Sequence, residues 1–259
     1  MKIADGNTQS LGVGVTQHAY PLTSSIEQRL RANNSDTYTN DMASRKYIPN
    51  IYIIGPQSTG KTTLVNKLRS DLEHPVADTL IVKPQIVSEV ARTVLRKHKF
   101  SAKDIWTSTI RCLELQQLIL EAQAVAEKEA LNHSSWFVSD RSGLDCMAYA
   151  KRYAAADAIQ ELQKLPAWTE VKARMEKSLI VVCEAGTPCL ADDGVRLMPT
   201  SEDDWMELFH EFCQLLDDTG LEYFVVPRTL LDLSERAELV HAKWNEKWQS
   251  VKHNQVDGP

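Results

Sequence analysis

A glycine-containing loop between an apolar run and a helical pattern constrains this chain more than any other feature. Residues 55–62 read GPQSTGKT, which satisfies the pattern G-x-x-x-x-G-K-[ST]. The apolar run Ile51–Ile54 precedes the loop directly, and apolar residues then recur at helical spacing over 64–72. The segment therefore predicts a strand, a phosphate-binding loop and a helix in succession.

Each part of the predicted loop has a chemical role. Successive backbone N–H groups would curl around phosphate oxygens, Lys61 would reach the β- and γ-phosphates, and the Thr62 hydroxyl would bind Mg²⁺. The sequence lacks the guanine-binding pattern N-K-x-D, so we expect ATP rather than GTP, with Mg²⁺ as the second cofactor. The residues assigned to nucleotide binding are Gly55, Pro56, Gln57, Ser58, Thr59, Gly60, Lys61, Thr62 and Thr63.

Further strands are predicted by short apolar runs at 85–88, 136–139, 179–182 and 223–226. Ser101 and Asp232 begin capping-box patterns, which predict a long helix to about Leu131 and a C-terminal helix. A further helix is predicted from about Ser201 to Gly220. The alternation indicates an α/β fold of three layers, a mostly parallel five-stranded sheet with helices on both faces.

We divide the chain into a mobile polar N-terminal extension over residues 1–45, one catalytic domain over 46–250 and a C-terminal tail over 251–259. The extension is rich in Ser, Thr, Asn and Gln.

The composition of the chain limits the classes of partner that it is expected to bind. The net charge of −6 and pI near 5.7 argue against a broad nucleic-acid or anionic-membrane surface. No apolar run approaches the roughly 20 residues that span a bilayer, and the five cysteines are scattered without metal-ligand spacing. We therefore expect a cytoplasmic protein with reduced thiols, a small-molecule substrate, no nucleic-acid partner and no transmembrane segment. The oligomeric state is left open.

Asp140 and Arg141 follow the predicted third strand, at the sheet edge where ligands of open α/β folds bind. Asp140 could join the Mg²⁺ shell or accept the proton of an attacking hydroxyl, and Arg141 could bind a substrate or a phosphate. The alternative is a helix cap next to an exposed ion pair.

Two further sets of residues are candidates. Glu89 and Arg92 follow the second strand one helical turn apart and could contact the substrate, although a surface salt bridge explains them equally well. Arg196 closes a loop of turn-forming residues after the fourth strand. That loop could act as a lid that brings Arg196 over the transferring phosphoryl group, and the alternative is a solvated surface arginine.

Five segments together, GPQSTGKTTL, SEVAR, DRS, DDGVR and SERA, resemble the kinase-like P-loop family that includes the NadR-type ribosylnicotinamide kinase domain, often labelled "AAA". The resemblance covers most of residues 47–245. It implies a nucleoside-kinase-like fold, ATP on the glycine loop, the pair Asp140–Arg141 facing the acceptor, and Arg196 over the phosphates. Nicotinamide riboside is one candidate acceptor, and a ring-forming remodelling ATPase is not expected.

Three functions stay open at this point. The first is transfer of the ATP γ-phosphoryl group to a hydroxyl of a small, nucleoside-like molecule, with Lys61, Asp140, Arg141 and Arg196 as catalytic residues. The second is a nucleotide-dependent switch that binds lipid, as the resemblance suggests for animal relatives. The third is a protein that binds nucleotide without chemistry. A closed acceptor cavity would favour the kinase, and an exposed apolar or basic groove would favour the switch.

Overall fold

A computed structural model describes residues 47–73, 82–187 and 199–256, with the side chains of residues 102 and 253–256 left undescribed. The chain divides into two units, Met1–Lys46 and Tyr47–Pro259, and every described residue belongs to the second. The predicted N-terminal extension and Arg196 lie outside the described residues.

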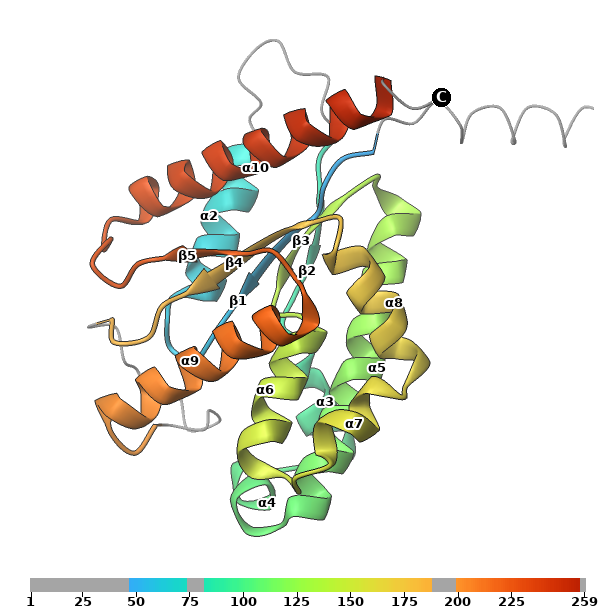
Figure 1. Ribbon diagram of the computed structural model, residues 1–259, viewed down its shortest axis with the longest axis vertical. Coiled ribbons are helices and arrows are strands. Elements are labelled where there is room, and N and C mark those ends of the chain that lie inside the picture. Colours follow the sequence, from blue (N-terminus) through green and yellow to red (C-terminus); the bar gives the residue numbers. More distant parts are fainter. Residues whose placement is uncertain (1–46, 74–81, 188–198, 257–259) are drawn as a thin grey trace, which may run out of the picture. The chain divides into compact units, whose positions relative to one another are not determined.

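The described residues form one parallel sheet in the order β2-β3-β1-β4-β5 (Figure 1). Its strands are β1 (Ile51–Ile54), β2 (Gln85–Val87), β3 (Phe137–Asp140), β4 (Leu179–Cys183) and β5 (Phe224–Val226). In register, Ile53 of β1 lies opposite Asp140 of β3 and Val181 of β4. This register puts the carboxyl end of β3 next to the start of the glycine loop. The predicted five-stranded α/β fold is confirmed.

Helices cover both faces of the sheet (Figure 1). On one face lie α2 (Lys61–Glu73) and α10 (Leu233–Val256). The other face is covered by α5 (Thr109–His133), α6 (Gly143–Tyr153), α8 (Pro166–Met175) and α9 (Glu202–Thr219). Three shorter helices, α3 (Ala91–His98), α4 (Ala102–Thr107) and α7 (Ala158–Gln163), complete the described set.

Strands β1 and β4 in the middle of the sheet consist of apolar and aromatic residues, and all of these residues are buried. Successive side chains of a strand point to opposite faces. Ile51 and Ile53 therefore pack with Leu64 and Trp244 on the α2/α10 side, and Tyr52 packs on the α5/α6 side. This two-sided burial is what a parallel sheet between helical layers requires.

The sequence prediction of one long helix from Ser101 to about Leu131 is wrong. The chain forms α4 and α5 instead, because Ser108 adopts an extended conformation (φ −146°, ψ 110°) and caps the second helix. The Ser108 hydroxyl accepts a hydrogen bond from the Arg111 N–H at 3.2 Å. The predicted capping box at Ser101 is present, and it begins the short helix α4. The break turns α4 toward α3, and both pack on α5 through a small cluster around Phe100 and Ile105.

Candidate functional site

The glycine loop adopts a backbone that only glycine tolerates at its first position. Gly55 has φ 123°, and a Cβ atom there would lie 2.7 Å from the carbonyl oxygen of Cys183 in β4. Gly60 has φ 80°, and Ser58, which is not a glycine, also has a positive φ of 58°. These left-handed residues turn the chain tightly between β1 and the first residue of α2.

Segments far along the chain hold the loop carbonyls. The Trp205 indole of α9 donates to the Gln57 carbonyl at 2.9 Å, and the Arg236 guanidinium of α10 donates to the Thr59 carbonyl at 3.0 Å. The Thr187 hydroxyl donates to the Ser58 carbonyl at 3.4 Å. The loop is therefore fixed from outside before any ligand arrives, which is the preorganisation that anion binding requires.

Lys61 lies buried at the centre of the loop. Its ammonium donates to the Pro56 carbonyl and to the Thr59 hydroxyl, the latter at 3.2 Å. Burial, reinforced by the nearby Arg141 guanidinium, lowers the pKa of Lys61 to about 7. A bound polyphosphate would add negative charge beside Lys61 to that of Asp145 and Asp140 and would raise its pKa.

Thr62 and Asp140 meet across the gap between the loop and β3. The Thr62 hydroxyl donates to Asp140 Oδ2 at 2.6 Å. The other carboxylate oxygen, Asp140 Oδ1, is buried and has no hydrogen-bond partner among the described residues. A hydroxyl and a carboxylate with a spare oxygen are the hard donors that Mg²⁺ prefers, so these residues fit that ion. No cluster of three or more His, Cys, Asp or Glu that could hold a metal occurs in the described ranges.

Arg141 has a left-handed backbone, with φ 88°. Its N–H donates to the Ile53 carbonyl at 3.0 Å, and its own carbonyl accepts from the Ser139 hydroxyl at 2.7 Å. The guanidinium lies 3.1 Å from Glu89 Oε1 and 3.3 Å from Asp145 Oδ1. These bonds hold the strained turn and aim the guanidinium at two acids.

Glu89 and Arg92 form the ion pair that the sequence suggested, with 2.8 Å between Arg92 Nε and Glu89 Oε2. Glu89 is the more buried partner and also binds Arg141. Burial alone would raise the pKa of Glu89, but Arg141 and Arg92 lower it below its ordinary value. Glu89 is therefore held ionised between two arginines.

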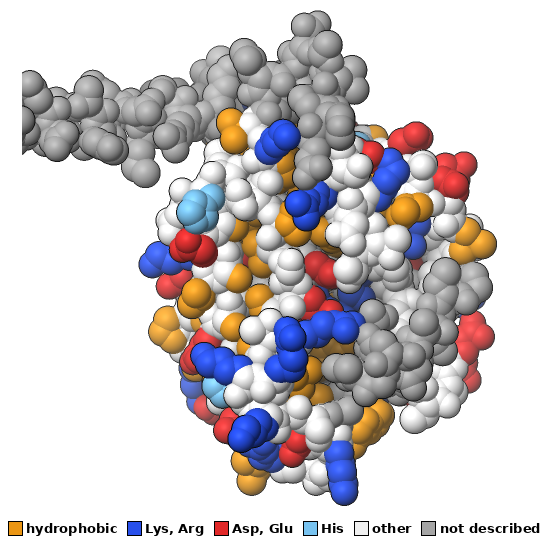
Figure 2. Space-filling view, turned by 180° about the vertical axis from the view of Figure 1, so that it is seen from behind, with side chains coloured by type: hydrophobic (Ala, Val, Ile, Leu, Met, Phe, Trp, Pro, Cys, Tyr) orange, Lys and Arg blue, Asp and Glu red, His pale blue; other side chains and the backbone are white. Residues whose placement is uncertain are grey.

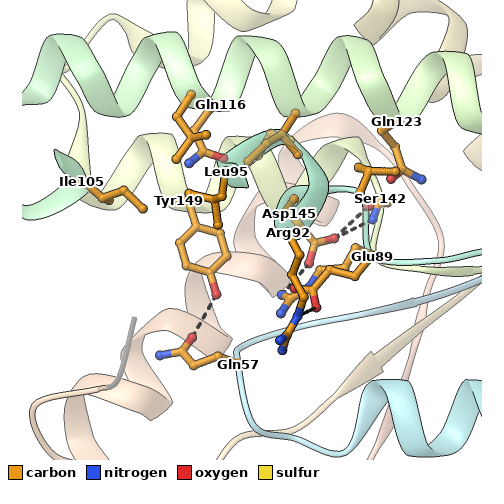
Figure 3. Close-up of a pocket in the computed structure, with 16 residues that line it drawn as sticks. Gln57, Glu89, Arg92, Leu95, Ile105, Gln116, Gln123, Ser142, Asp145 and Tyr149 are labelled. Carbon is orange, nitrogen blue, oxygen red and sulfur yellow. Dashed lines mark hydrogen bonds and ion pairs between the residues drawn. The ribbon is translucent and has the colours of Figure 1, made fainter. Parts of the chain in front are cut away.

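A cavity next to the loop brings these groups together (Figure 3). Glu89, Arg92, Arg141 and Asp145 line its charged part, and Gln57 of the loop forms part of the wall. The rest is mostly apolar, with contributions from α3, α4, α5 and α6. Asp140 does not line this cavity; it lies beside the loop with Thr62.

Sequence reasoning missed several residues of the site. Asp145 lines the cavity and completes a capping box with Ser142, and burial raises its pKa against the opposing effect of Arg141. The pattern Ser-x-x-Asp over 142–145 signals that helix start and could have been found. Arg236 lies within the segment SERA that the sequence resemblance includes, but no role was assigned to it, and Tyr149 carries no such local signal.

A family model described as "AAA domain" matches residues 50–254. The chain belongs to this AAA domain family. The match includes the glycine loop, β3 and α10. The resemblance inferred from the sequence motifs is thereby confirmed. No curated protein matches the sequence.

Solved structures of similar fold include two of NadR protein. One, in complex with NR, has a TM-score of 0.54 and 22% identity, covering 78% of this chain and 52% of that one. The other, in complex with NAD and AMP-PNP, has a TM-score of 0.56 and 19% identity, covering 85% of this chain and 56% of that one. The chain thus spans about half the length of these structures. Their likeness confirms the P-loop fold of this member of the AAA domain family.

The visible surface is of mixed charge. Figure 2 shows acidic, basic and hydrophobic side chains interspersed over the face opposite to that of Figure 1. Across the described ranges, no helix combines the length and the apolar character needed to span a bilayer.

Proposed function

We propose that the protein transfers the γ-phosphoryl group of ATP to a hydroxyl of a small, nucleoside-like acceptor. The observation that carries this proposal is the cavity itself. It adjoins the phosphate loop through Gln57 and is lined by the ion-paired side chains Glu89, Arg141 and Asp145. A concave, mostly apolar site with a few convergent charged groups is typical of small-molecule binding. A lipid-binding switch would need an exposed groove instead.

In the proposed reaction, the glycine loop binds the nucleotide together with Thr62 and Asp140. The backbone N–H groups of residues 57–63 would bind the phosphates, and Lys61 would turn from the Pro56 carbonyl toward them. Thr62 and Asp140 would hold Mg²⁺ with the hydroxyl and the spare carboxylate oxygen. When bound, the ion offsets charge on the phosphates.

The acceptor side falls to residues of the cavity. Arg141 anchors a hydroxyl or a phosphate, with its direction set by Glu89 and Asp145. Glu89 is ionised, lines the cavity and accepts the proton of the attacking hydroxyl. We prefer Glu89 to Asp140 in this role because Asp140 is turned to Thr62 and away from the cavity lining. Arg196 stays a proposed lid residue.

Nicotinamide riboside is the first acceptor to test, because the sequence motifs resemble those of the ribosylnicotinamide kinases. The purified protein is incubated with ATP, Mg²⁺ and a panel of nucleosides that includes nicotinamide riboside, and phosphorylated product is measured. Lys61→Ala should abolish product. Lys67→Ala, on the same helix but paired with Asp71 at the surface, should retain it. Nucleotide binding without transfer to any acceptor would contradict the proposal.

A further inference from the structure

Gln123 of α5 lines the cavity, and only 1% of the residue is exposed. Figure 3 shows it on the same helix as Gln116, at the opposite end of the drawn cavity from Ile105. Buried amides in native proteins have their polar atoms hydrogen-bonded, so each atom of this one calls for a partner.

The amide nitrogen has two partners, and both are acceptors. Gln123 Nε2 donates to Glu127 Oε1 at 2.9 Å and to Ser139 Oγ at 3.0 Å. The other Glu127 oxygen already receives the Arg174 guanidinium at 2.7 Å and the Tyr52 hydroxyl at 2.9 Å. These contacts make Glu127 a carboxylate that accepts from every side.

Ser139 accepts as well, because its single hydroxyl hydrogen goes elsewhere. That hydroxyl donates to the Arg141 carbonyl at 2.7 Å. With acceptors in both directions, the amide can present only its NH₂ group to them. The orientation of the Gln123 amide therefore follows from the surrounding network.

The amide oxygen of Gln123 is not used by this network. Gln123 Oε1 is buried and has no hydrogen-bond partner in the part of the chain that the structure describes. Ile119, one helical turn before Gln123, is apolar and cannot donate, and Gln116, the other amide of this helix in the cavity lining, makes no hydrogen bond to Oε1. A ligand in the cavity could supply the donor that Oε1 lacks.

We propose that Gln123 selects acceptors whose heterocyclic base carries an N–H donor, an amino or a carboxamide group, which it receives at Oε1. This inference rests on the proposed function. The apolar side chains of Leu115 and Ile119 suit the face of a flat ring, and the charged groups Glu89, Arg92 and Arg141 suit a hydroxyl-rich sugar. A base without a donor leaves the oxygen unpaired and binds more weakly.

Matched nucleosides that differ by one donor group test this assignment. The pairs are adenosine and purine riboside, cytidine and 2-pyrimidinone riboside, and nicotinamide riboside and pyridinium riboside. Dissociation constants are measured by calorimetry with AMP-PNP and Mg²⁺ present. In the wild type, the donor-bearing member of at least one pair should bind about 5- to 100-fold more tightly.

Variants of the network separate the oxygen from its surroundings. Gln123→Met keeps the length of the side chain and removes the acceptor, so the preference should fall to about twofold or less. Ser139→Ala removes one bond to the amide nitrogen but leaves Oε1 in place, so the preference should persist. A preference that survives in Gln123→Met overturns the proposal.

A crystal structure of the wild type with the tightest-binding nucleoside decides the matter even if Gln123→Met does not fold. A ligand N–H within about 3.2 Å of Oε1 supports the assignment, and a water molecule there instead overturns it. Equal affinities within every pair, with phosphoryl transfer intact, overturn this inference and leave the proposed function standing. Absence of binding and transfer for all nucleosides overturns both.

Discussion

The Tyr149 hydroxyl donates a hydrogen bond to the side-chain oxygen of Gln57 at 2.9 Å. Tyr149 belongs to α6 and lines the cavity, whereas Gln57 belongs to the phosphate loop. Figure 3 shows this bond spanning the space between the two elements. In the proposed reaction, this contact would couple the position of a bound acceptor to the phosphate loop.

Tyr149→Phe removes this bond and keeps the ring. We expect kcat/KM for the acceptor to fall about tenfold, as for the loss of one buried hydrogen bond, with little change in ATP affinity. Steady-state kinetics and nucleotide titration measure the two effects. Tyr153→Phe on the same helix, outside the cavity lining, should behave as the wild type. An equal loss in both variants would show that the contact with Gln57 has no special role.

Asp140→Asn replaces the carboxylate that faces Thr62. In this variant, Mg²⁺ should no longer increase the affinity for nucleotide. We expect transfer to fall about 100-fold or more, because the metal then lacks its protein carboxylate. Titration with AMP-PNP with and without Mg²⁺ isolates the effect. Asp71→Asn, a charge-matched change on the surface of α2, is the control. Unaltered Mg²⁺ dependence in Asp140→Asn would exclude the assignment.

Binding of ATP should take up a proton at pH 8. The pKa of Lys61 is about 7 in the free protein, so its amine is mostly neutral at pH 8, and bound phosphates raise that pKa. The uptake approaches one proton at pH 8 and vanishes toward pH 6, where the amine is already charged. Calorimetry in buffers of different ionisation enthalpy measures it. Lys61→Met should show no such uptake, and the same proton count in both proteins would refute the prediction.

The lowered pKa of Lys61 also determines how its contribution to the free energy of unfolding changes with pH. In the unfolded chain this amine has the ordinary lysine pKa of 10.5, so unfolding binds a proton between about pH 7 and 10.5. The contribution of Lys61 to the free energy of unfolding therefore rises with pH across that window. It is at its most unfavourable below pH 7.

Arg174→Ala should lower the free energy of unfolding by about 3 kcal/mol, because it leaves the fully buried Glu127 without its cation. Since burial then raises the pKa of Glu127 further, the deficit should shrink as pH falls and the carboxyl becomes neutral. Denaturant unfolding at several pH values measures both. Lys172→Ala breaks an exposed pair on the same helix and should change stability by less than about 0.5 kcal/mol. Similar losses in the two variants would contradict this account.

Local patterns predicted the sheet well and the helical layer less well. Strands β1, β3 and β4 are fully buried and most strand residues are apolar, so short apolar runs in the sequence mark the sheet. The break at Ser108 was missed because a serine within an otherwise helical pattern can either continue a helix or cap a new one. Tertiary packing of α4 against α3 and α5 decides between the two.

The site shows the same division. The proximity of Thr62 and Asp140 could be anticipated, since the carboxyl ends of neighbouring parallel strands share an edge. The proposed role of Gln123 could not be anticipated from the sequence, because it depends on Glu127 and Ser139 both accepting hydrogen bonds from its amide nitrogen. Nothing in the local sequence around a glutamine reveals which of its atoms will be left without a partner.

The contacts of α10 with the glycine loop determine when the predicted nucleotide site can be completed during synthesis of the chain. Arg236 binds the Thr59 carbonyl and Trp244 donates to the Pro49 carbonyl at 2.7 Å, across 177 and 195 positions of the chain. On a ribosome, the loop emerges before these residues do and at first lacks the contacts that they make. We therefore expect nucleotide to help a nascent chain only after α10 has been made, which places triphosphate binding at the end of folding.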